Sequence, residues 1–279
     1  MSLLRVVHTT SFDYTDAVTA SYNEARMTPV DDARQVVRGA HVDVRPHTWT
    51  DSYRDYWGTE VTIFEVLRPH ERLDIVATAT VEVASAGPAR SGAGWDVLGG
   101  EEASDAHSPF LAETPTTAVP DDVAALALET AAGLDPDDAA EAVCLAVRDR
   151  LEYVAGVTTV HSPAADAWAA REGVCQDMAH LGIGALRSVG IPARYVSGYL
   201  LPQSDAAVGE AVHGESHAWL EWWAGQWVGY DPTNRRFVGE DHVVIGRGRE
   251  YADVPPLKGV FAGAGASSLD VTVEMTRLA

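Results

Sequence analysis

The residue best suited to carry out a chemical reaction in this 279-residue sequence is Cys175, one of two cysteines. The residues that follow it are apolar at three- and four-residue spacing, which is typical of an amphipathic helix. Gly190-Ile191-Pro192 ends this pattern in the order expected after a helix. Cys175 therefore lies at a predicted helix N-terminus, where unpaired N–H groups and the macrodipole favour a thiolate. This position suits a nucleophile, and a buried structural cysteine is the alternative.

His217 and Asp231 lie on two predicted strands that are joined by a turn at Ala224-Gly225-Gln226. A two-residue loop would place their side chains on opposite faces of the hairpin. A loop with an odd number of residues would place them on one face: pairing residue 223 with residue 227 would make them diagonal neighbours, and pairing residue 222 with residue 226 would make them directly opposite. Three-residue hairpin loops are common. The carboxylate would then orient the imidazole and stabilise its protonated form. A thiol, an imidazole and a carboxylate supply the nucleophile, base and orienting group of acyl transfer.

The second half of the chain predicts the elements that would position these groups. Acidic residues in a first turn and a stop at Gly133 mark one helix. Cys144 lies in the next predicted helix and is most simply a small buried hydrophobe. Gly182 and Gly184 would allow another element to approach the Cys175 helix closely. We predict helices over 121–132, 136–152, 163–170 and 175–189, and strands over 194–200, 217–223 and 227–231.

Residues 1–85 differ in character, since apolar and polar residues alternate and β-branched residues are frequent. This pattern predicts an antiparallel β-domain. Residues 86–119 are rich in Gly, Ser, Pro and Thr, which indicates a linker or a loosely packed crossover. Residues 120–279 form the remaining part, with the predicted helices first. The strands expected in the β-domain cover 5–9, 36–44, 59–66 and 73–83.

The composition excludes several classes of protein. The formal net charge is −21, from 20 Lys+Arg against 41 Asp+Glu, and such a field repels the phosphates of nucleic acid and anionic membranes. The sequence lacks an apolar run of about 18 residues, so it predicts no membrane span. Two cysteines do not make a disulfide framework, and MSLLRVVHTTSFDY lacks the features of a signal peptide. We expect a cytoplasmic protein without nucleic-acid or membrane partners.

Four motifs in the second half occur in a characteristic order. They are Gly173-Val-Cys175-Gln-Asp177-Met-Ala-His180-Leu, Gly190-Ile-Pro-Ala-Arg194-Tyr-Val-Ser-Gly198-Tyr, Ser216-His217-Ala-Trp219-Leu-Glu221 and Tyr230-Asp231-Pro-Thr-Asn234. Together they resemble the bacterial transglutaminase-like superfamily, in its cysteine-protease branch. The first 85 residues, which contain Asp55-Tyr-Trp-Gly58, resemble the N-terminal domain of such proteins. Residues 248–256 and the closing strand 270–275 resemble their C-terminal extension.

The resemblance implies an α+β fold, in which a β-domain precedes a papain-like core whose cysteine-bearing helix packs on an antiparallel sheet. It implies a triad with Cys175 as nucleophile, His217 as base and acid, and Asp231 as orienting carboxylate. The implied reaction is acyl transfer from a peptide or protein amide through a thioester. Hydrolysis is the expected outcome, and protein cross-linking or deamidation is the alternative. This chemistry requires no metal or organic cofactor.

The donors that would stabilise an oxyanion are less clear from the motifs. Relatives place a Trp or Gln upstream of the cysteine, and here Tyr153 and Trp168 are the candidates, although both also suit a core. The backbone N–H of Cys175 is the safer donor.

Other motif residues have both a structural and a functional interpretation. Gln176 and Met178 stand where family members commonly carry Arg and Phe, which would tune the cleft. Asp177 suits a capping role in the first helical turn better than a substrate contact. Trp219 and Gln176 are candidates to line the cleft, while core packing is the alternative for the tryptophans around His217.

Three other classes of function compete with this interpretation. A metal site could be built from Cys175, His180, His213, His217 and Asp231, but Gly214 argues against a helical pairing of two of these histidines. Arylamine acetyltransferases also use a Cys–His–Asp triad, but their nucleophile comes early in the chain. A non-catalytic binding module with a transglutaminase-like fold is the third, and the intact triad argues against it.

Overall fold

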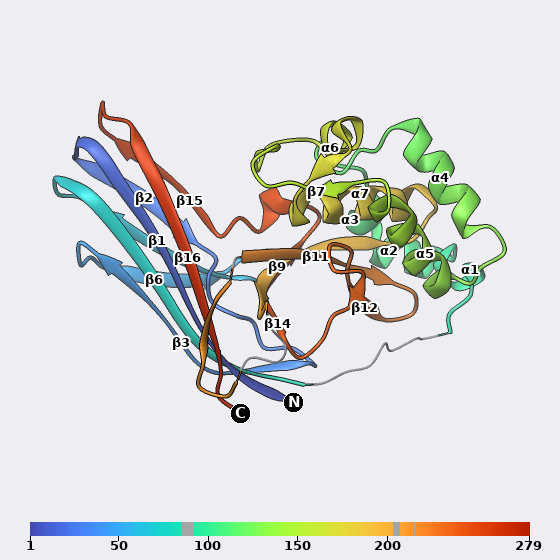
Figure 1. Ribbon diagram of the computed structural model, residues 1–279, viewed down its shortest axis with the longest axis horizontal. Helices are drawn as coiled ribbons and strands as arrows, with labels where there is room; N and C mark the ends of the chain where they lie inside the picture. Colours follow the sequence, from blue (N-terminus) through green and yellow to red (C-terminus); the bar gives the residue numbers. More distant parts are fainter. Residues whose placement is uncertain (85–91, 203–206, 215) are drawn as a thin grey trace.

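The chain folds into two lobes, a β lobe of long strands and a core lobe in which helices lie beside a smaller sheet (Figure 1). The computed structural model describes residues 1–84, 92–202, 207–214 and 216–279. Both chain ends lie in the β lobe, at the same end of its long strands (Figure 1). The predicted α+β class is therefore confirmed.

The β lobe begins with six strands, most of which alternate buried and exposed residues. They are β1 (Ser2–Val18), β2 (Ala20–Ala25), β3 (Gln35–Arg45), β4 (Thr50–Arg54), β5 (Glu60–Val66) and β6 (His70–Val83). In β6 every second residue from Leu73 to Val83 is buried, as the two-residue period of a strand with one buried face requires. The predicted antiparallel β region is confirmed. The sequence pattern did not predict β2 and β4, which are short and rich in polar residues.

Two strands from the end of the chain return to this lobe. β15 (Leu257–Ala262) pairs with β2, and β16 (Ser267–Arg277) pairs with β1 in an antiparallel register. A short strand from the middle of the chain, β10 (Ala211–Gly214), pairs with the other edge of β16. The two sheets therefore have the orders β10-β16-β1-β6-β3 and β15-β2-β5-β4. The sequence pattern places the C-terminal extension with residues 120–279, whereas the structure places these two strands in the β lobe.

The core lobe packs helices against an antiparallel sheet with the order β13-β12-β11-β9-β14. The strands are β9 (Ala193–Leu200), β11 (Ser216–Trp223), β12 (Trp227–Asp231), β13 (Arg236–Phe237) and β14 (His242–Gly248). The larger helices are α4 (Asp121–Ala131), α5 (Pro136–Arg148), α6 (Ala164–Ala170) and α7 (Cys175–Ser188). Every residue of α7 from Gln176 to Arg187 is buried, so this helix is the centre of the lobe. Within the described ranges, the chain forms no helix that is both long and apolar enough to cross a bilayer.

The segment predicted as a linker, residues 86–119, contains three short helices and packs on the core. They are α1 (Trp95–Leu98), α2 (Glu101–Ala106) and α3 (Ser108–Leu111), while residues 86–91 of the predicted linker lie outside the described residues. The buried guanidinium of Arg187 in α7 donates to the carbonyl oxygens of Phe110 and Ala112, at 3.0 and 2.9 Å. These bonds to a charged donor hold the segment against the core, so it is not loosely packed where the structure describes it.

Two glycines let neighbouring segments contact the backbone of α7, as predicted. A Cβ atom on Gly182 would lie 2.6 Å from Cδ2 of Leu220 in β11. A Cβ atom on Gly184 would lie 2.1 Å from the carbonyl oxygen of Thr117 and 2.5 Å from Cγ1 of Val119. Atoms that are not bonded to each other cannot approach so closely, so any larger residue at either position must displace its neighbour.

We expect Gly184→Ala to lower the free energy of unfolding by about 1–3 kcal/mol, because the added methyl group overpacks against the backbone at Thr117. This loss should exceed the gain of roughly 1 kcal/mol in helix propensity. Denaturant titration measures the change. Gly39→Ala is the matched control, because a Cβ atom there would meet nothing within 4 Å. Equal stability of Gly184→Ala and wild type would contradict the close approach.

Candidate active site

Cys175 is the first residue of α7, as predicted, and its surroundings define the start of that helix. The Asp177 carboxylate accepts hydrogen bonds from the backbone N–H of Val174 at 2.8 Å and from the Thr158 hydroxyl at 2.7 Å. A Cβ atom on Gly173 would lie 2.9 Å from that of Asp177, so only glycine fits beside the cap. Asp177 is almost fully buried, which supports the capping role predicted for it. Cys175 itself remains partly exposed.

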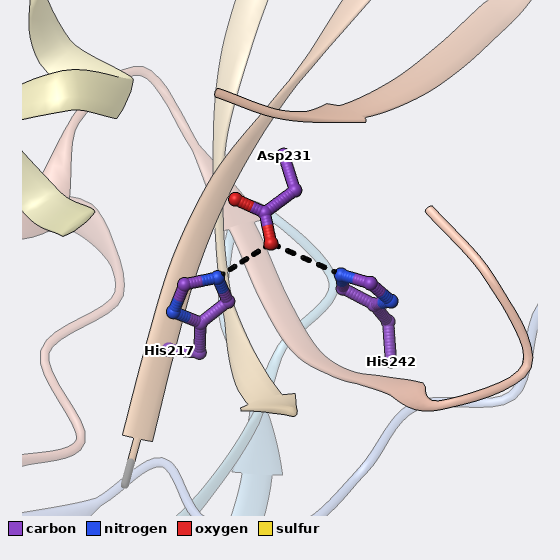
Figure 2. Close-up of side chains that lie close together, drawn as sticks. All are labelled: His217, Asp231 and His242. Carbon is purple, nitrogen blue, oxygen red and sulfur yellow. Dashed lines mark hydrogen bonds and ion pairs between the residues drawn. The ribbon is translucent and has the colours of Figure 1, made fainter. Parts of the chain in front are cut away.

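His217 and Asp231 meet on one face of the hairpin between β11 and β12. Trp223 pairs with Trp227, and Gly225 in the three-residue loop has a φ of 87°. This is one of the two pairings for which the sequence analysis predicted a shared face, and glycine is suited to the positive φ. Nε2 of His217 lies 2.8 Å from Oδ2 of Asp231 (Figure 2). The imidazole and the carboxylate are therefore diagonal neighbours on a rigid ribbon.

The thiol of Cys175 completes this arrangement from the helix side. Burial lowers the pKa of His217, but hydrogen bonds with Asp231 and Cys175 and the charges of both groups raise it to about 10. Because Nε2 faces Asp231, the second ring nitrogen is the one left for the thiol. The raised pKa favours the protonated form of the His217 imidazole at neutral pH.

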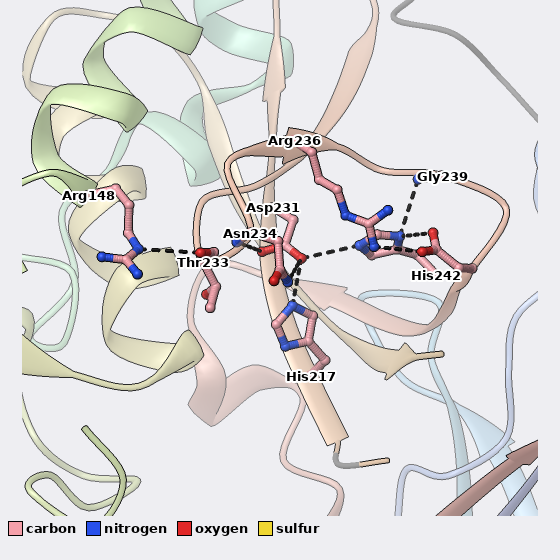
Figure 3. Close-up of polar contacts among 9 residues, drawn as sticks. Arg148, His217, Asp231, Thr233, Asn234, Arg236, Gly239 and His242 are labelled. Atoms are coloured by element: carbon pink, nitrogen blue, oxygen red, sulfur yellow. Dashed lines mark hydrogen bonds and ion pairs between the residues drawn. The ribbon is translucent and has the colours of Figure 1, made fainter. Parts of the chain in front are cut away.

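Asp231 has no exposed surface and has four hydrogen-bonding contacts. Besides His217, Asn234 donates from its backbone N–H at 3.1 Å and from its side-chain amide at 2.7 Å. His242 approaches the same carboxylate oxygen as His217, at 3.3 Å (Figure 3). Burial raises the pKa of Asp231, but bonds with His217, His242 and Asn234 and the charge of His217 outweigh it and hold that pKa well below its usual range. The carboxylate is thus ionised and oriented.

His242 is the residue at this site that the sequence pattern missed. It begins β14, a strand without a predicted counterpart, and its ring is buried beside Asp231 and Asp241. An Asp-His pair before an apolar strand is too common a pattern to mark an active-site residue. Asn234, in contrast, stands in one of the motifs that carried the resemblance.

Two hollows lie beside β11. His217 lines an open pocket of about 370 Å³ together with Leu200, Pro202, His213 and Gly214. A second pocket of about 280 Å³ lies between the lobes, where Ser216 and Tyr251 of the core face the β lobe. Its other walls are mainly apolar and include Phe12, Tyr14, Leu257, Val260, Phe261, Leu269 and Val271. The imidazole of His217 can therefore be reached from solvent, and the β lobe contributes a wall next to β11.

The oxyanion candidates differ in their surroundings. The indole N–H of Trp168 donates to Asp122 at 2.8 Å and its ring is buried, so this side chain is committed to the core. Tyr153 lies half exposed in β7 (Glu152–Tyr153), which pairs with β8 (Glu172–Gly173) in a register that places it opposite Gly173. The N–H of Cys175 begins a helix and has no helical acceptor, as an oxyanion donor requires.

Neither side chain predicted to line the cleft is free to do so in this structure. Trp219 is fully buried among Val196, Val238 and Val244, so it forms part of the core, which was the alternative interpretation. Gln176 is also buried, and its amide donates to the carbonyl oxygen of Val160 at 3.1 Å. The hydrophobic effect favours burial of an indole among these valine side chains.

The metal site considered from the sequence is not the one that the fold groups together. Among the described residues, ligand atoms come within 4.8 Å of one another only in the set His217, Asp231 and His242. His180 is fully buried, and its Nε2 accepts the backbone N–H of Tyr251 at 3.1 Å. Burial also lowers the pKa of His180 to about 4.

Most of the chain matches known protein families. Residues 4–82 match the bacterial transglutaminase-like N-terminal region, and residues 124–232 match the transglutaminase-like superfamily core. An uncharacterized protein of Mycobacterium leprae is 45% identical over 276 residues, which is 99% of each chain. An uncharacterized protein of Mycobacterium tuberculosis is 34% identical over 291 residues, covering 97% of this chain and 91% of the relative. The crystal structure of a candidate cysteine protease from Cytophaga hutchinsonii aligns with a TM-score of 0.76 at 21% identity, covering 100% and 92% of the chains.

Proposed function

Because the chain belongs to the bacterial transglutaminase-like superfamily, we propose that it is a cysteine-dependent acyl-transfer enzyme that acts on amide bonds. The catalytic triad is Cys175, His217 and Asp231. One observation carries this proposal: the His217 imidazole lies 2.8 Å from the Asp231 carboxylate, and the Cys175 thiol at the start of α7 is close enough to help raise the pKa of that imidazole. That is the arrangement of nucleophile, base and orienting group that acyl transfer needs.

The proposed reaction has two halves, acylation and deacylation. The Cys175 thiolate attacks the amide carbonyl carbon, and the carbonyl π electrons move to oxygen, where the N–H groups at the start of α7 stabilise the negative charge. The C–N bond then breaks, and the His217 imidazolium gives its proton to the departing amine. A thioester remains on the sulfur. Water attacks it while His217 takes the proton, and the carboxylic acid leaves.

We propose that water, and not a second amine, accepts the acyl group, so that the protein is a peptidase or amidase. The open pocket beside His217 supports access of water to the thioester. A peptide library with product masses read by mass spectrometry tests this choice. Cleaved peptides support hydrolysis, whereas deamidated peptides or incorporated amines would assign the triad to a transglutaminase reaction.

The first test of the triad needs no substrate. Iodoacetamide at neutral pH should alkylate Cys175 faster than Cys144 by roughly two orders of magnitude, because the Cys175 sulfur is partly exposed at a helix N-terminus, which is a position that suits a reactive thiol. Cys144 is almost fully buried, and burial together with the charge of Glu141 raises the pKa of its thiol. Peptide mapping of the alkylated protein measures both rates.

Cys144→Ala is the control for that experiment, and it should leave the alkylation rate at position 175 unchanged. Equal, slow alkylation of both cysteines would count against a catalytic thiol. It would favour a binding module that retains the fold without the chemistry.

A further inference from the structure

The pocket between the two lobes lies at the start of β11, the strand that carries His217. It has a volume of about 280 Å³, and Ser216, the residue before His217, forms part of its wall (Figure 1). Pockets for small ligands begin at about 300 Å³, so this volume suits one large side chain and not the surface of a second protein. Consecutive residues lie about 3.8 Å apart, and an extended peptide spans about 3.4 Å per residue. One peptide can therefore reach both the pocket and the proposed triad.

Tyr251 connects this pocket to the cysteine side of the site. It lines the pocket, and its ring lies edge-on to that of Tyr195, with 6.4 Å between the ring centroids. Burial, followed by the charges of Cys175 and Tyr251, raises the pKa of Tyr195, so the thiol and Tyr251 both lie near the Tyr195 ring. The backbone N–H of Tyr251 also donates to His180 of α7 at 3.1 Å. The pocket therefore borders the proposed site from the side of α7 as well as from the side of β11.

Four large apolar side chains in the wall of the pocket are exposed to solvent. They are Val260 and Phe261 of β15 and Leu269 and Val271 of β16. Exposed apolar residues that gather in a hollow mark a binding site, because a ligand that covers them removes apolar surface from water. The strands β15 and β16 return from the end of the chain to pair with β2 and β1. This pairing places the apolar wall across the pocket from Ser216 and Tyr251 of the core lobe.

The pocket wall is uncharged as well as apolar. The ring nitrogens of His8 lie 2.8 Å from the Tyr199 hydroxyl and 3.2 Å from the Thr10 hydroxyl, so both have partners inside the β lobe. Burial lowers the pKa of His8 to about 4, which leaves its ring neutral at neutral pH. None of the described residues that line the pocket is Asp, Glu, Lys or Arg, although the formal net charge of the chain is −21. A charged group would therefore be buried here without an opposite charge, which is costly.

We propose that this pocket binds a large apolar side chain, with aromatic residues preferred, of a peptide substrate whose amide bond lies at the proposed triad. The rings of Tyr14 and Phe261 already pack against each other in the wall, with 5.1 Å between their centroids. An aromatic side chain of the substrate would extend this packing. The β lobe thus selects the substrate, and the core lobe carries out the reaction. The inference rests on the proposed function and adds a substrate class to it.

Protection of the Cys175 thiol from iodoacetamide tests the pocket without any turnover. The probes are three blocked peptides, acetyl-Ala-Phe-Ala-amide, acetyl-Ala-Ala-Ala-amide and acetyl-Ala-Glu-Ala-amide. Peptide mapping measures the alkylation rate of Cys175 with and without each peptide over a range of concentrations, and the ratio of the two rates yields a dissociation constant. The Phe peptide should bind at least about tenfold more tightly than the other two, because it alone buries a large apolar side chain.

Val271→Asp tests whether the protection comes from this pocket. The new carboxylate in the apolar wall should weaken binding of the Phe peptide by roughly tenfold or more. Val36→Asp is the matched control, because Val36 is also a strand residue that is 45% exposed, as Val271 is, and it does not line this pocket. It should leave all three dissociation constants unchanged. Phe261→Ala removes an aromatic ring from the wall, should also weaken binding of the Phe peptide, and serves if Val271→Asp does not fold.

Equal protection by the three peptides, or tighter binding of the Glu peptide, would overturn the proposal, as would unchanged binding of the Phe peptide by Val271→Asp. A dimer in light scattering that Val271→Asp dissociates would assign the apolar wall to a second copy of the chain and would also overturn it. Slow alkylation of Cys175 without any peptide would instead contradict the proposed function. In that case ¹H–¹⁵N spectra still test the pocket: shifts of the Val260 and Val271 amide signals with the Phe peptide alone would support it, and unmoved signals would overturn it.

Discussion

Cys175→Ala should abolish turnover, with a loss of at least about 10⁴-fold in kcat, while the protein remains folded. The loss is large because no other described group offers a nucleophile at the start of α7. The fold should survive because Asp177, and not the sulfur, caps the helix. The change in stability should stay within about 1 kcal/mol, as is usual for partly exposed positions away from caps and cavities.

Turnover of the model ester p-nitrophenyl acetate and of any peptide found in the library screen measures this effect, and thermal unfolding monitors the fold. Cys175→Ser gives a second reading, since a hydroxyl of similar size is a far weaker nucleophile beside the same imidazole. Cys144→Ala should retain wild-type turnover. Full activity of Cys175→Ala would show that the nucleophile lies elsewhere.

Asp231→Asn should lower kcat by roughly 10³- to 10⁴-fold, the size of effect known when the carboxylate of a Ser–His–Asp triad becomes an amide. The amide keeps the shape but removes the charge that holds the His217 proton and orients its ring. It also leaves the buried His242 ring beside a neutral group. We therefore expect the alkaline limb of the pH–rate profile to move downward.

The measurement is turnover of p-nitrophenyl acetate across the alkaline pH range, with the thermal midpoint recorded alongside. Asp149→Asn is the matched control, because Asp149 forms its ion pair with Arg235 at the exposed surface and should matter to neither rate nor profile. Wild-type turnover in Asp231→Asn would remove the carboxylate from the mechanism. A lower rate with an unmoved limb would show that it acts without setting the charge of His217.

The triad also links stability to pH in both directions. The folded-state pKa of His217 is raised to about 10, so its contribution to stability is present below the unfolded value near 6.5 and is lost as pH rises through about 10. The pKa of Asp231 is depressed, so its contribution is present above the unfolded value near 4 and is lost as pH falls below it. Both contributions to the stability of the folded protein are therefore fully present only between the unfolded pKa values of Asp231 and His217, near 4 and near 6.5.

Much of the site could be predicted because its parts are local. A helix that begins at Cys175 follows from apolar spacing and a terminal Gly-Pro signal within about 20 residues. The shared face of His217 and Asp231 follows from the parity of one short loop, and the observed pairing of Trp223 with Trp227 is one of the pairings that parity allowed. Periods of 3.6 and 2 residues are properties of neighbouring positions, so one sequence is enough to display them.

Other features of this protein depend on segments that are distant in the sequence. The chain alone determined which residues carry a thiol, an imidazole and a carboxylate on a helix end and a hairpin. Only the tertiary structure decided that β16 pairs with β1, that Trp219 is buried, and that His242 lies behind Asp231. The physical reason is that burial and strand pairing depend on how the whole chain packs, and no local period records which distant side chains meet.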